Sequence, residues 1–197
     1  MNRSEPTVLK QFIERYITIS STDWDEIQAY FNRRELEKDE IILQEGEICR
    51  QLYFLESGLL RYYIMTDGEE RNKFFTVAPY FFTSQFSFNQ QQPAKETIQA
   101  IEDSMIWEVT YQENQQLLQL ESWNLFARKI TQEVQFFTEE ILEELQTETA
   151  ENRYLKLMNN QPELLQRIPL KHLASYLGIA PQSLSRIRKK LMANGRS

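Results

Sequence analysis

The sequence predicts an α+β fold in which an antiparallel β-sandwich or barrel lies between two N-terminal helices and a helical C-terminal part. Three observations predict it. Apolar residues recur at helical spacing near the N-terminus, short β-rich runs alternate with turn signals from about residue 33 to 110, and residues 112–148 contain neither Gly nor Pro. A chain of 197 residues suffices for one or two domains with a sizeable core.

Residues 5–31 are expected to form two helices. Four apolar residues of the first helix lie at positions i, i+3, i+4 and i+7 and therefore share one face. They are Leu9, Phe12, Ile13 and Tyr16. Ser21 and Thr22 then precede an acidic turn, which favours the start of a second, capped helix.

Six short runs make up the β-rich region. They are Ile41–Leu43, Leu52–Leu55, Leu59–Met65, Lys73–Val77, Thr97–Ile101 and Met105–Val109. Gly46, Gly58 and Gly68 follow one another at intervals of 12 and 10 residues, a spacing typical of antiparallel sandwiches and barrels. Asp67-Gly68 favours a hairpin turn, because Gly tolerates the positive φ that such turns require.

Residues 112–148 are expected to form a long helical region. Its apolar residues follow one stripe with spacings of 4, 4, 3, 4 and 4 residues: Phe126, Ile130, Val134, Phe137, Ile141 and Leu145. The remaining surface of this helix is largely acidic, so the stripe must be buried against something. The stripe packs either on its own β domain or, as we prefer, against the same helix of a second copy, which predicts a homodimer.

Charge is distributed unevenly along the chain. The overall net charge is −7, but residues 152–197 contain nine Lys or Arg and a single acid, Glu163. A basic segment on an acidic body favours a polyanionic partner, most simply nucleic acid.

The sequence also excludes several classes of protein. One Cys (Cys49) cannot form a disulfide framework or a four-thiolate site, and one His (His172) cannot form a multi-His metal cage. An enzyme of this β-rich type would be a cupin, whose metal site uses several histidines, and residues 1–171 contain none. We therefore expect no metal, no cofactor, no catalytic residues and no enzyme. No apolar run approaches the ~20 residues of a membrane span, and the N-terminus lacks the apolar core of a signal peptide. We therefore expect a cytoplasmic protein without a membrane partner.

Residues 169–191 have the spacing of a helix-turn-helix. The apolar face of the first helix consists of Leu170, Leu173, Ala174 and Leu177. Gly178 permits a left-handed turn, Ile179 fills the corner, and Pro181 begins a second helix at a position where its missing N–H costs nothing. The second helix, residues 181–192, is buried through Leu184, Ile187 and Leu191.

The polar face of this second helix supplies candidate DNA contacts. At about 100° per residue, one group of side chains points away from the buried face and can read bases in a major groove: Gln182, Ser185, Arg186 and Lys189. A second group is expected to contact phosphates: Lys171, His172, Ser183, Arg188 and Lys190.

Four segments carry a resemblance to a known family: Ile41–Glu47, Leu52–Gly58, Leu177–Ile179 and Ser183–Ile187. Together they make the chain similar, along nearly its whole length, to the cyclic-AMP receptor protein/FNR (CRP/FNR) family of bacterial transcription regulators. The resemblance implies a double-stranded β-helix (jelly roll) of the cyclic-nucleotide-binding type with N-terminal helices over residues 1–111. It further implies a dimerisation helix region over 112–148 and a winged helix-turn-helix DNA-binding domain over 149–197. The partners it implies are double-stranded DNA, a second copy of the chain and RNA polymerase.

The positions that the resemblance assigns to an effector depart from the family pattern. Members that bind cyclic AMP hold the ribose with a Gly-Glu pair and the phosphate with an Arg-Ser pair. These positions hold Thr83-Ser84, followed by Gln85, and Ala94-Lys95. Three possibilities stay open: a filled or differently used pocket, which we favour, another small effector, or a cyclic nucleotide.

Two functions are compatible with these features. The first is a homodimeric DNA-binding transcription regulator that reads a palindromic site and has an effector other than cyclic AMP. The alternative is a sensor of a small molecule or cyclic nucleotide whose output is protein contact.

Overall fold

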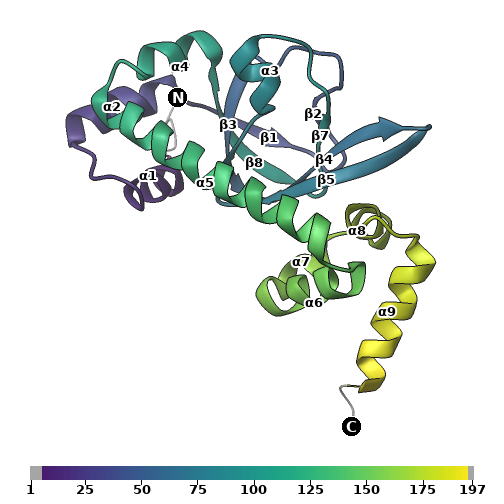
Figure 1. Ribbon diagram of the computed structural model, residues 1–197. Coiled ribbons are helices and arrows are strands. Elements are labelled where there is room, and N and C mark those ends of the chain that lie inside the picture. The colour runs from purple at the N-terminus through teal and green to yellow at the C-terminus, as the bar shows by residue number, and fades with distance from the viewer. Residues whose placement is uncertain (1–5, 195–197) are drawn as a thin grey trace. The chain divides into compact units, whose positions relative to one another are not determined.

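The computed structural model describes residues 6–194, in which two antiparallel four-stranded sheets are accompanied by nine helices (Figure 1). The strands are β1 (Asn32–Leu36), β2 (Ile41–Leu43), β3 (Gln51–Ser57), β4 (Leu59–Thr66), β5 (Glu69–Val77), β6 (Tyr80–Phe82), β7 (Thr97–Ala100) and β8 (Ser104–Thr110). The helices are α1 (Thr7–Glu14), α2 (Ser21–Tyr30), α3 (Gln85–Gln90), α4 (Tyr111–Leu117), α5 (Glu121–Thr147), α6 (Ala150–Asn160), α7 (Pro162–Arg167), α8 (Leu170–Leu177) and α9 (Pro181–Asn194). The predicted α+β class with antiparallel sheets and a long helix is confirmed.

The strand order is β1-β8-β3-β6 in one sheet and β2-β7-β4-β5 in the other. Strands distant in sequence are thus neighbours, as in a jelly roll rather than a simple meander. Strand β3 illustrates the packing, because Tyr53, Phe54 and Leu55 are all buried and both faces of the strand are therefore covered.

The sequence does not predict strands β1 and β6 or helix α3, and it gives no separate helices for α6 and α7. Strand β1 has the sequence NRREL, in which only Leu36 is buried, and it forms the edge of its sheet beside β8. Strand β6 and helix α3 lie within the aromatic and polar run after residue 79, which lacks a clear period of two or 3.6 residues. The predicted helical region 112–148 is divided into two helices. Helix α4 begins at a capping box formed by Thr110 and Glu113 and ends at Leu117, and α5 begins at Glu121.

The β4–β5 hairpin turns at Asp67 and Gly68, as predicted. Asp67 and Gly68 both have positive φ, 54° and 78°. Glycine tolerates positive φ without a steric penalty, which suits it to the second position of this turn. Glycine is required at position 58 for a different reason, because a Cβ there would lie 2.0 Å from Ser104 Oγ. A side chain at Gly58 would therefore collide with β8.

The chain divides into two compact units. One contains the described residues of Met1–Tyr62 and Phe75–Phe136, and the other contains Tyr63–Phe74 and the described residues of Phe137–Ser197. This division differs from the predicted boundaries after residues 111 and 148. Helix α5 contributes to both units, and the tip of the β4–β5 hairpin groups with the C-terminal helices.

The first unit has an aromatic core between the outer face of the β1-β8-β3-β6 sheet and helices α1, α2, α4 and α5 (Figure 1). Phe126 lies at its centre. Its ring centroid is 5.2 Å from that of Phe81 and 5.3 Å from that of Trp123. The first two turns of α5 are therefore part of the core of this unit.

The second unit contains α8 and α9, which are joined by a short turn at the position where the sequence predicts a helix-turn-helix. Gly178 ends α8 with φ 72°, the Ile179 N–H donates to the Ala174 carbonyl at 3.0 Å, and Pro181 begins α9. These are the turn and start residues that the sequence predicts. Between residues 111 and 194 no strand follows, so the wing implied by the family resemblance does not occur in this described segment.

The hairpin tip packs against α8 within the second unit. β5 is an edge strand, and the Ser175 hydroxyl accepts a hydrogen bond from the Asn72 N–H at 3.0 Å and donates one to the Glu70 carbonyl at 2.9 Å. The Asn72 amide also donates to the His172 carbonyl at 3.3 Å. One helix thus satisfies backbone groups that an edge strand otherwise leaves to solvent.

Candidate functional site

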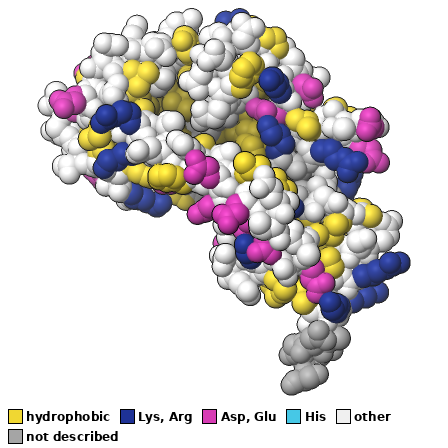
Figure 2. All heavy atoms as spheres, viewed as in Figure 1, with side chains coloured by type: hydrophobic (Ala, Val, Ile, Leu, Met, Phe, Trp, Pro, Cys, Tyr) yellow, Lys and Arg dark blue, Asp and Glu magenta, His cyan; other side chains and the backbone are white. Residues whose placement is uncertain are grey.

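The outer face of α9 carries the four residues predicted to contact bases. Gln182, Arg186 and Lys189 are exposed and Ser185 is half-buried, whereas Leu184 is fully buried against the rest of the unit. The polar and apolar faces of α9 are therefore separated as the 100° spacing requires. Figure 2 shows Lys and Arg side chains over the α9 region, with acidic side chains beside them.

The residues predicted to contact phosphates have different surroundings. Lys171 is exposed, while His172 and Ser183 are half-buried. Arg188 is half-buried, with its guanidinium carbon 5.7 Å from the ring centroid of Tyr154. Lys190 Nζ lies 2.7 Å from Glu151 Oε1. Their roles at DNA stay predictions, but two of these cations already have partners within the unit.

Arg153, like Arg188 and Lys190, has its partners within the second unit. It is 7% exposed, donates to the Tyr176 carbonyl at 3.2 Å, and places its guanidinium carbon 5.1 Å from the Tyr176 ring centroid. Together with Arg188 on Tyr154, it fixes α6 against α8 and α9 through cation–π contacts. In the sequence alone, both arginines are visible only as positive charges.

The predicted effector positions surround a buried carboxylate that the sequence analysis missed. Ser84 Oγ donates a 2.6 Å hydrogen bond to Glu96 Oε1, and the two residues are 1% and 8% exposed. Ser84 is the position where the family resemblance expects the ribose-binding carboxylate. Glu96 brings a carboxylate to the same place from the end of the segment before β7.

The cation expected at the phosphate position is absent. Ala94 is 3% exposed and its backbone is held by Glu47 and Gly46 through hydrogen bonds of 2.7 and 2.9 Å. Lys95 is exposed, with Nζ 4.5 Å from the ring centroid of the exposed Phe86. Lys95, in the bend before β7, therefore points outward, whereas its neighbour Ala94 is buried.

A hydrogen-bonded cluster occupies the remaining space beside these positions. Thr83 Oγ1 donates to the Gln51 carbonyl at 3.0 Å and lies 3.2 Å from Cys49 Sγ, while Ser87 Oγ accepts from the Cys49 N–H at 2.8 Å. Gln85, the remaining predicted position, is exposed at the start of α3. Cys49 is 1% exposed and is thus a buried, packed thiol.

Aromatic side chains complete the filling of the sandwich interior. Tyr53 stacks on Phe82 with ring centroids 4.8 Å apart, and Tyr62 is 1% exposed. Burial raises the pKa of Tyr62 well above its ordinary value, and the nearby Glu96 carboxylate raises it further. The Tyr62 phenol therefore stays protonated at neutral pH, and none of the predicted effector positions places a cation in the interior.

The predicted dimer stripe on α5 divides into a buried and an exposed part. Phe126 is 1% exposed and belongs to the core of its own unit, so its assignment to a dimer interface is corrected: the face it occupies covers Phe81 and Trp123. Ile130, Val134 and Ile141 are half-buried. Phe137 and Leu145 are 49% and 56% exposed.

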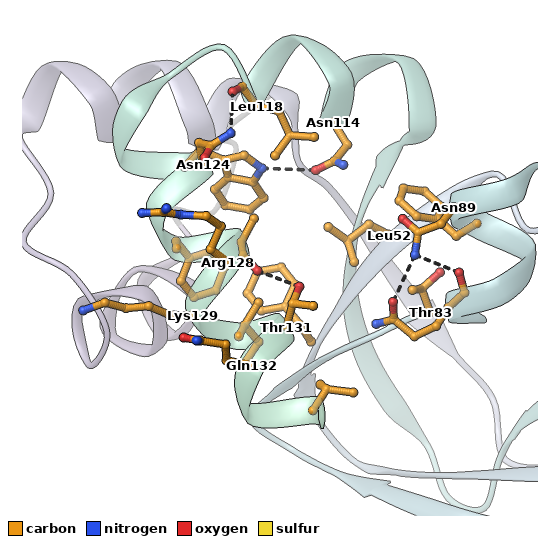
Figure 3. A pocket seen from close by; sticks show the side chains of 18 of the residues that line it. Leu52, Thr83, Asn89, Asn114, Leu118, Asn124, Arg128, Lys129, Thr131 and Gln132 are labelled. Atoms are coloured by element: carbon orange, nitrogen blue, oxygen red, sulfur yellow. Dashed lines mark hydrogen bonds between the residues drawn. The ribbon is translucent and has the colours of Figure 1, made fainter. Parts of the chain in front are cut away.

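A groove of about 690 Å³ runs along the first half of α5. Apolar side chains such as Leu52, Phe88 and Ile130 line it, and α3 and β6 contribute its other wall. In Figure 3, Asn89 and Thr83 lie on the side opposite α5, and Asn124, Arg128 and Gln132 lie along the helix. The groove ends at Val134, from which the exposed part of the stripe continues along the same helix.

Two phenols hold α5 on the first unit. Tyr16 donates to Glu133 Oε2 at 2.6 Å, and Tyr80 donates to Glu133 Oε1 at 3.0 Å. Burial and the adjacent carboxylate raise the pKa of both tyrosines. Because Tyr80 belongs to β6, this carboxylate connects the helix to the strand that precedes the effector positions.

Residues 6–194 contain neither a candidate metal site nor a candidate membrane span. No group of three or more His, Cys, Asp or Glu side chains in this range is arranged to hold a metal ion. None of the helices described here is long and apolar enough to cross a membrane.

Residues 33–121 match the family described as the cyclic nucleotide-binding domain. No curated relative matches the sequence. The fold of the first unit and the family match thus agree on a cyclic-nucleotide-binding-type domain.

Solved structures extend the likeness to nearly the whole chain. The catabolite activator protein of Thermus thermophilus is 20% identical, with 91% of this chain and 87% of that chain covered and a TM-score of 0.57. The c-di-GMP-responsive global regulator CLP of Xanthomonas campestris is also 20% identical, with 89% and 93% covered and a TM-score of 0.66.

A third similar structure is a putative transcriptional regulator of the CRP/FNR family from Eubacterium rectale. It is 16% identical, with 92% of this chain and 89% of that chain covered and a TM-score of 0.71. These likenesses confirm the resemblance seen in the sequence motifs. Residues 33–121 thus match the cyclic nucleotide-binding domain, and the fold of nearly the whole chain is similar to the folds of CRP/FNR-type transcription regulators.

Proposed function

We propose that the protein is a homodimeric, DNA-binding transcription regulator that reads a palindromic site with α9. The observation that carries the proposal is the separation of faces on α9. Gln182, Arg186 and Lys189 are exposed together on a helix whose opposite face is buried through Leu184. A helix that presents Gln and Arg in this way suits bidentate contacts with adenine and guanine in the major groove.

The apolar stripe of α5 supports the proposed dimer. An exposed apolar stripe through Phe137 and Leu145 continues from the groove beside Ile130 and Val134. We propose a second copy of the chain as its occupant, because a two-fold axis along α5 covers the stripe and pairs two α9 helices for two half-sites. RNA polymerase is the further partner that a transcription regulator requires, and the cytoplasm is its proposed location.

The effector is proposed to be something other than cyclic AMP or cyclic GMP. A cyclic phosphate is an anion, and burying an anion without a cation costs several kcal/mol. The pocket positions offer Glu96, a second anion, and Ala94 where the guanidinium is expected. A packed pocket that no nucleotide enters is the reading that this arrangement supports best.

Binding to duplex DNA at several salt concentrations distinguishes this proposal from a sensor whose output is protein contact. The DNA-binding regulator should bind with an affinity that falls steeply with salt, because phosphate contacts release counterions. Arg186→Ala should cost about 1–3 kcal/mol on the preferred duplex and much less on a random duplex. Absence of duplex binding by the wild-type chain would favour the protein-contact alternative.

A further inference from the structure

Glu151 and Lys190 form an ion pair between α6 and α9, with 2.7 Å between Oε1 and Nζ. Lys190 is one of the cations predicted to contact a DNA phosphate. We propose that Glu151 is an intramolecular stand-in for that phosphate, which occupies Lys190 in the free protein and lowers affinity for DNA of every sequence. The inference rests on the proposed DNA binding and identifies a residue that sets its strength.

The framework around the pair fixes the carboxylate near α9. Thr149 caps α6 by accepting from the Asn152 N–H at 3.2 Å, which places Glu151 in the first turn of the helix. A carboxylate is stabilised there by the helix dipole. The stacking of Arg188 on Tyr154, 5.7 Å from guanidinium carbon to ring centroid, adds a second side-chain contact between α6 and α9.

The pair is selective among the cations of α9. Arg186 and Lys189 are exposed, and neither has an acidic partner among the residues that the structure describes. Another lysine of this unit, Lys156, pairs with Glu144 and Glu148 at 3.0 and 3.3 Å, and it lies on α6 itself. Glu151 thus neutralises one cation at the flank of α9 and leaves the proposed base-reading face unpaired.

An exposed ion pair of this kind is weak enough to exchange. The side chains of Lys190 and Glu151 are 60% and 34% exposed, so solvent screens their attraction. A DNA phosphate competes for the same Nζ, and its neighbours repel the Glu151 carboxylate. Since phosphates are the same in all sequences, the cost applies equally to specific and random duplexes.

The test compares Glu151→Gln with the wild-type full-length chain by fluorescence anisotropy on a preferred and a random duplex across a salt series. The variant should bind both duplexes about 3–10-fold more tightly near ~0.1 M salt, and the gain should shrink as salt rises. The slope of log affinity against log salt concentration should become steeper, by up to about the amount expected for one additional phosphate contact.

Two controls separate this effect from a change in net charge or folding. Glu163→Gln removes an equal charge from an exposed position on α7 and should change affinity by less than half as much. In a Lys190→Ala background, Glu151→Gln should lose most of its effect, because the cation it releases is gone. Circular dichroism and thermal melting should show that all variants fold alike.

Each outcome decides between the two proposals. If the wild-type chain binds DNA and Glu151→Gln gives no gain, or gives the gain of Glu163→Gln, the phosphate stand-in is refuted and DNA binding survives. If the gain persists without Lys190, the pair is not its cause, and the inference is again refuted. If no variant binds duplex DNA, the proposed function fails and this inference fails with it.

Discussion

Ser84 donates a 2.6 Å hydrogen bond to Glu96 inside the β-sandwich, where neither side chain is more than 8% exposed. The relationship places a carboxylate where the family resemblance expects one, although a different segment supplies it. No comparable replacement is seen at Ala94, where the phosphate-binding cation is expected. An acceptor for a ribose hydroxyl is thus available, but the position predicted to hold the cyclic phosphate supplies no cation.

Calorimetry with cyclic AMP and cyclic GMP tests this reading of the pocket. We expect no binding at about 100 μM, because each lost charge-assisted contact removes ~1.5–3 kcal/mol and weakens binding by at least about two orders of magnitude in total. Affinity for DNA should also be unchanged by either nucleotide. A micromolar dissociation constant would refute the prediction and show that a cation such as Lys95 or Arg71 reaches the phosphate.

The α5 stripe predicts how the oligomeric state responds to substitution. Phe137→Glu combined with Leu145→Glu should give folded monomers in light scattering, because two exposed apolar groups of the proposed interface become charged. Phe136→Glu is the matched control: Phe136 is 61% exposed but lies about 100° around the helix from Phe137, so the dimer should persist. A folded dimer of the double variant would place the interface elsewhere.

Phe126→Ala is predicted to behave differently from the interface variants. Phe126 is buried in the core, so its truncation should cost about 3–5 kcal/mol of unfolding free energy. Chemical denaturation measures this cost. A loss below about 1 kcal/mol would contradict its central place among the aromatic rings.

The tyrosines predict a loss of stability at alkaline pH. Tyr16, Tyr80 and Tyr62 have pKa values above the ordinary value of 10.0, and burial is the first cause for all three. For Tyr16 and Tyr80 the Glu133 carboxylate raises the pKa further. The folded state therefore keeps protons that the unfolded state releases, so the unfolding free energy should be flat below about pH 10 and fall above it. Denaturation at a series of pH values measures the slope.

Replacing Tyr16 and Tyr80 with Phe should make this alkaline slope shallower, since two of the shifted groups are removed. The double variant should also be less stable near neutral pH, because Glu133 loses both of its phenol donors. An unchanged slope would mean that these two tyrosines ionise alike in the folded and unfolded states.

Local chemistry explains which parts were predictable from the sequence. Gly178 and Pro181 specify the turn and the second helix of the helix-turn-helix through backbone conformation alone, and the helical period then separates the faces of α9. Asp67-Gly68 specifies its hairpin in the same way. Each of these features depends on residues only a few positions apart.

Features that depend on distant contacts could not be predicted. Lys190 pairs with Glu151, and Arg188 stacks on Tyr154. The two residues of each pair are about 35 or more positions apart in the sequence. The composition alone therefore shows only that this segment is basic. Phe126 continues the helical period of the stripe, and only the packed aromatic rings show that it faces the core. Glu96 belongs to no recognisable sequence motif. Its role becomes visible only in the fold, where Ser84 hydrogen-bonds to it.

Selection of bound duplexes from a random pool tests the central claim, sequence-specific DNA reading by a dimer, most directly. We predict enrichment of a palindrome whose half-sites lie about one helical turn, ~34 Å, or a multiple of it apart. The same selection with Arg186→Ala should lose the preference at one base pair of each half-site while keeping the spacing. A pool that shows no enrichment with the wild-type chain, or an identical motif with Arg186→Ala, would contradict the account.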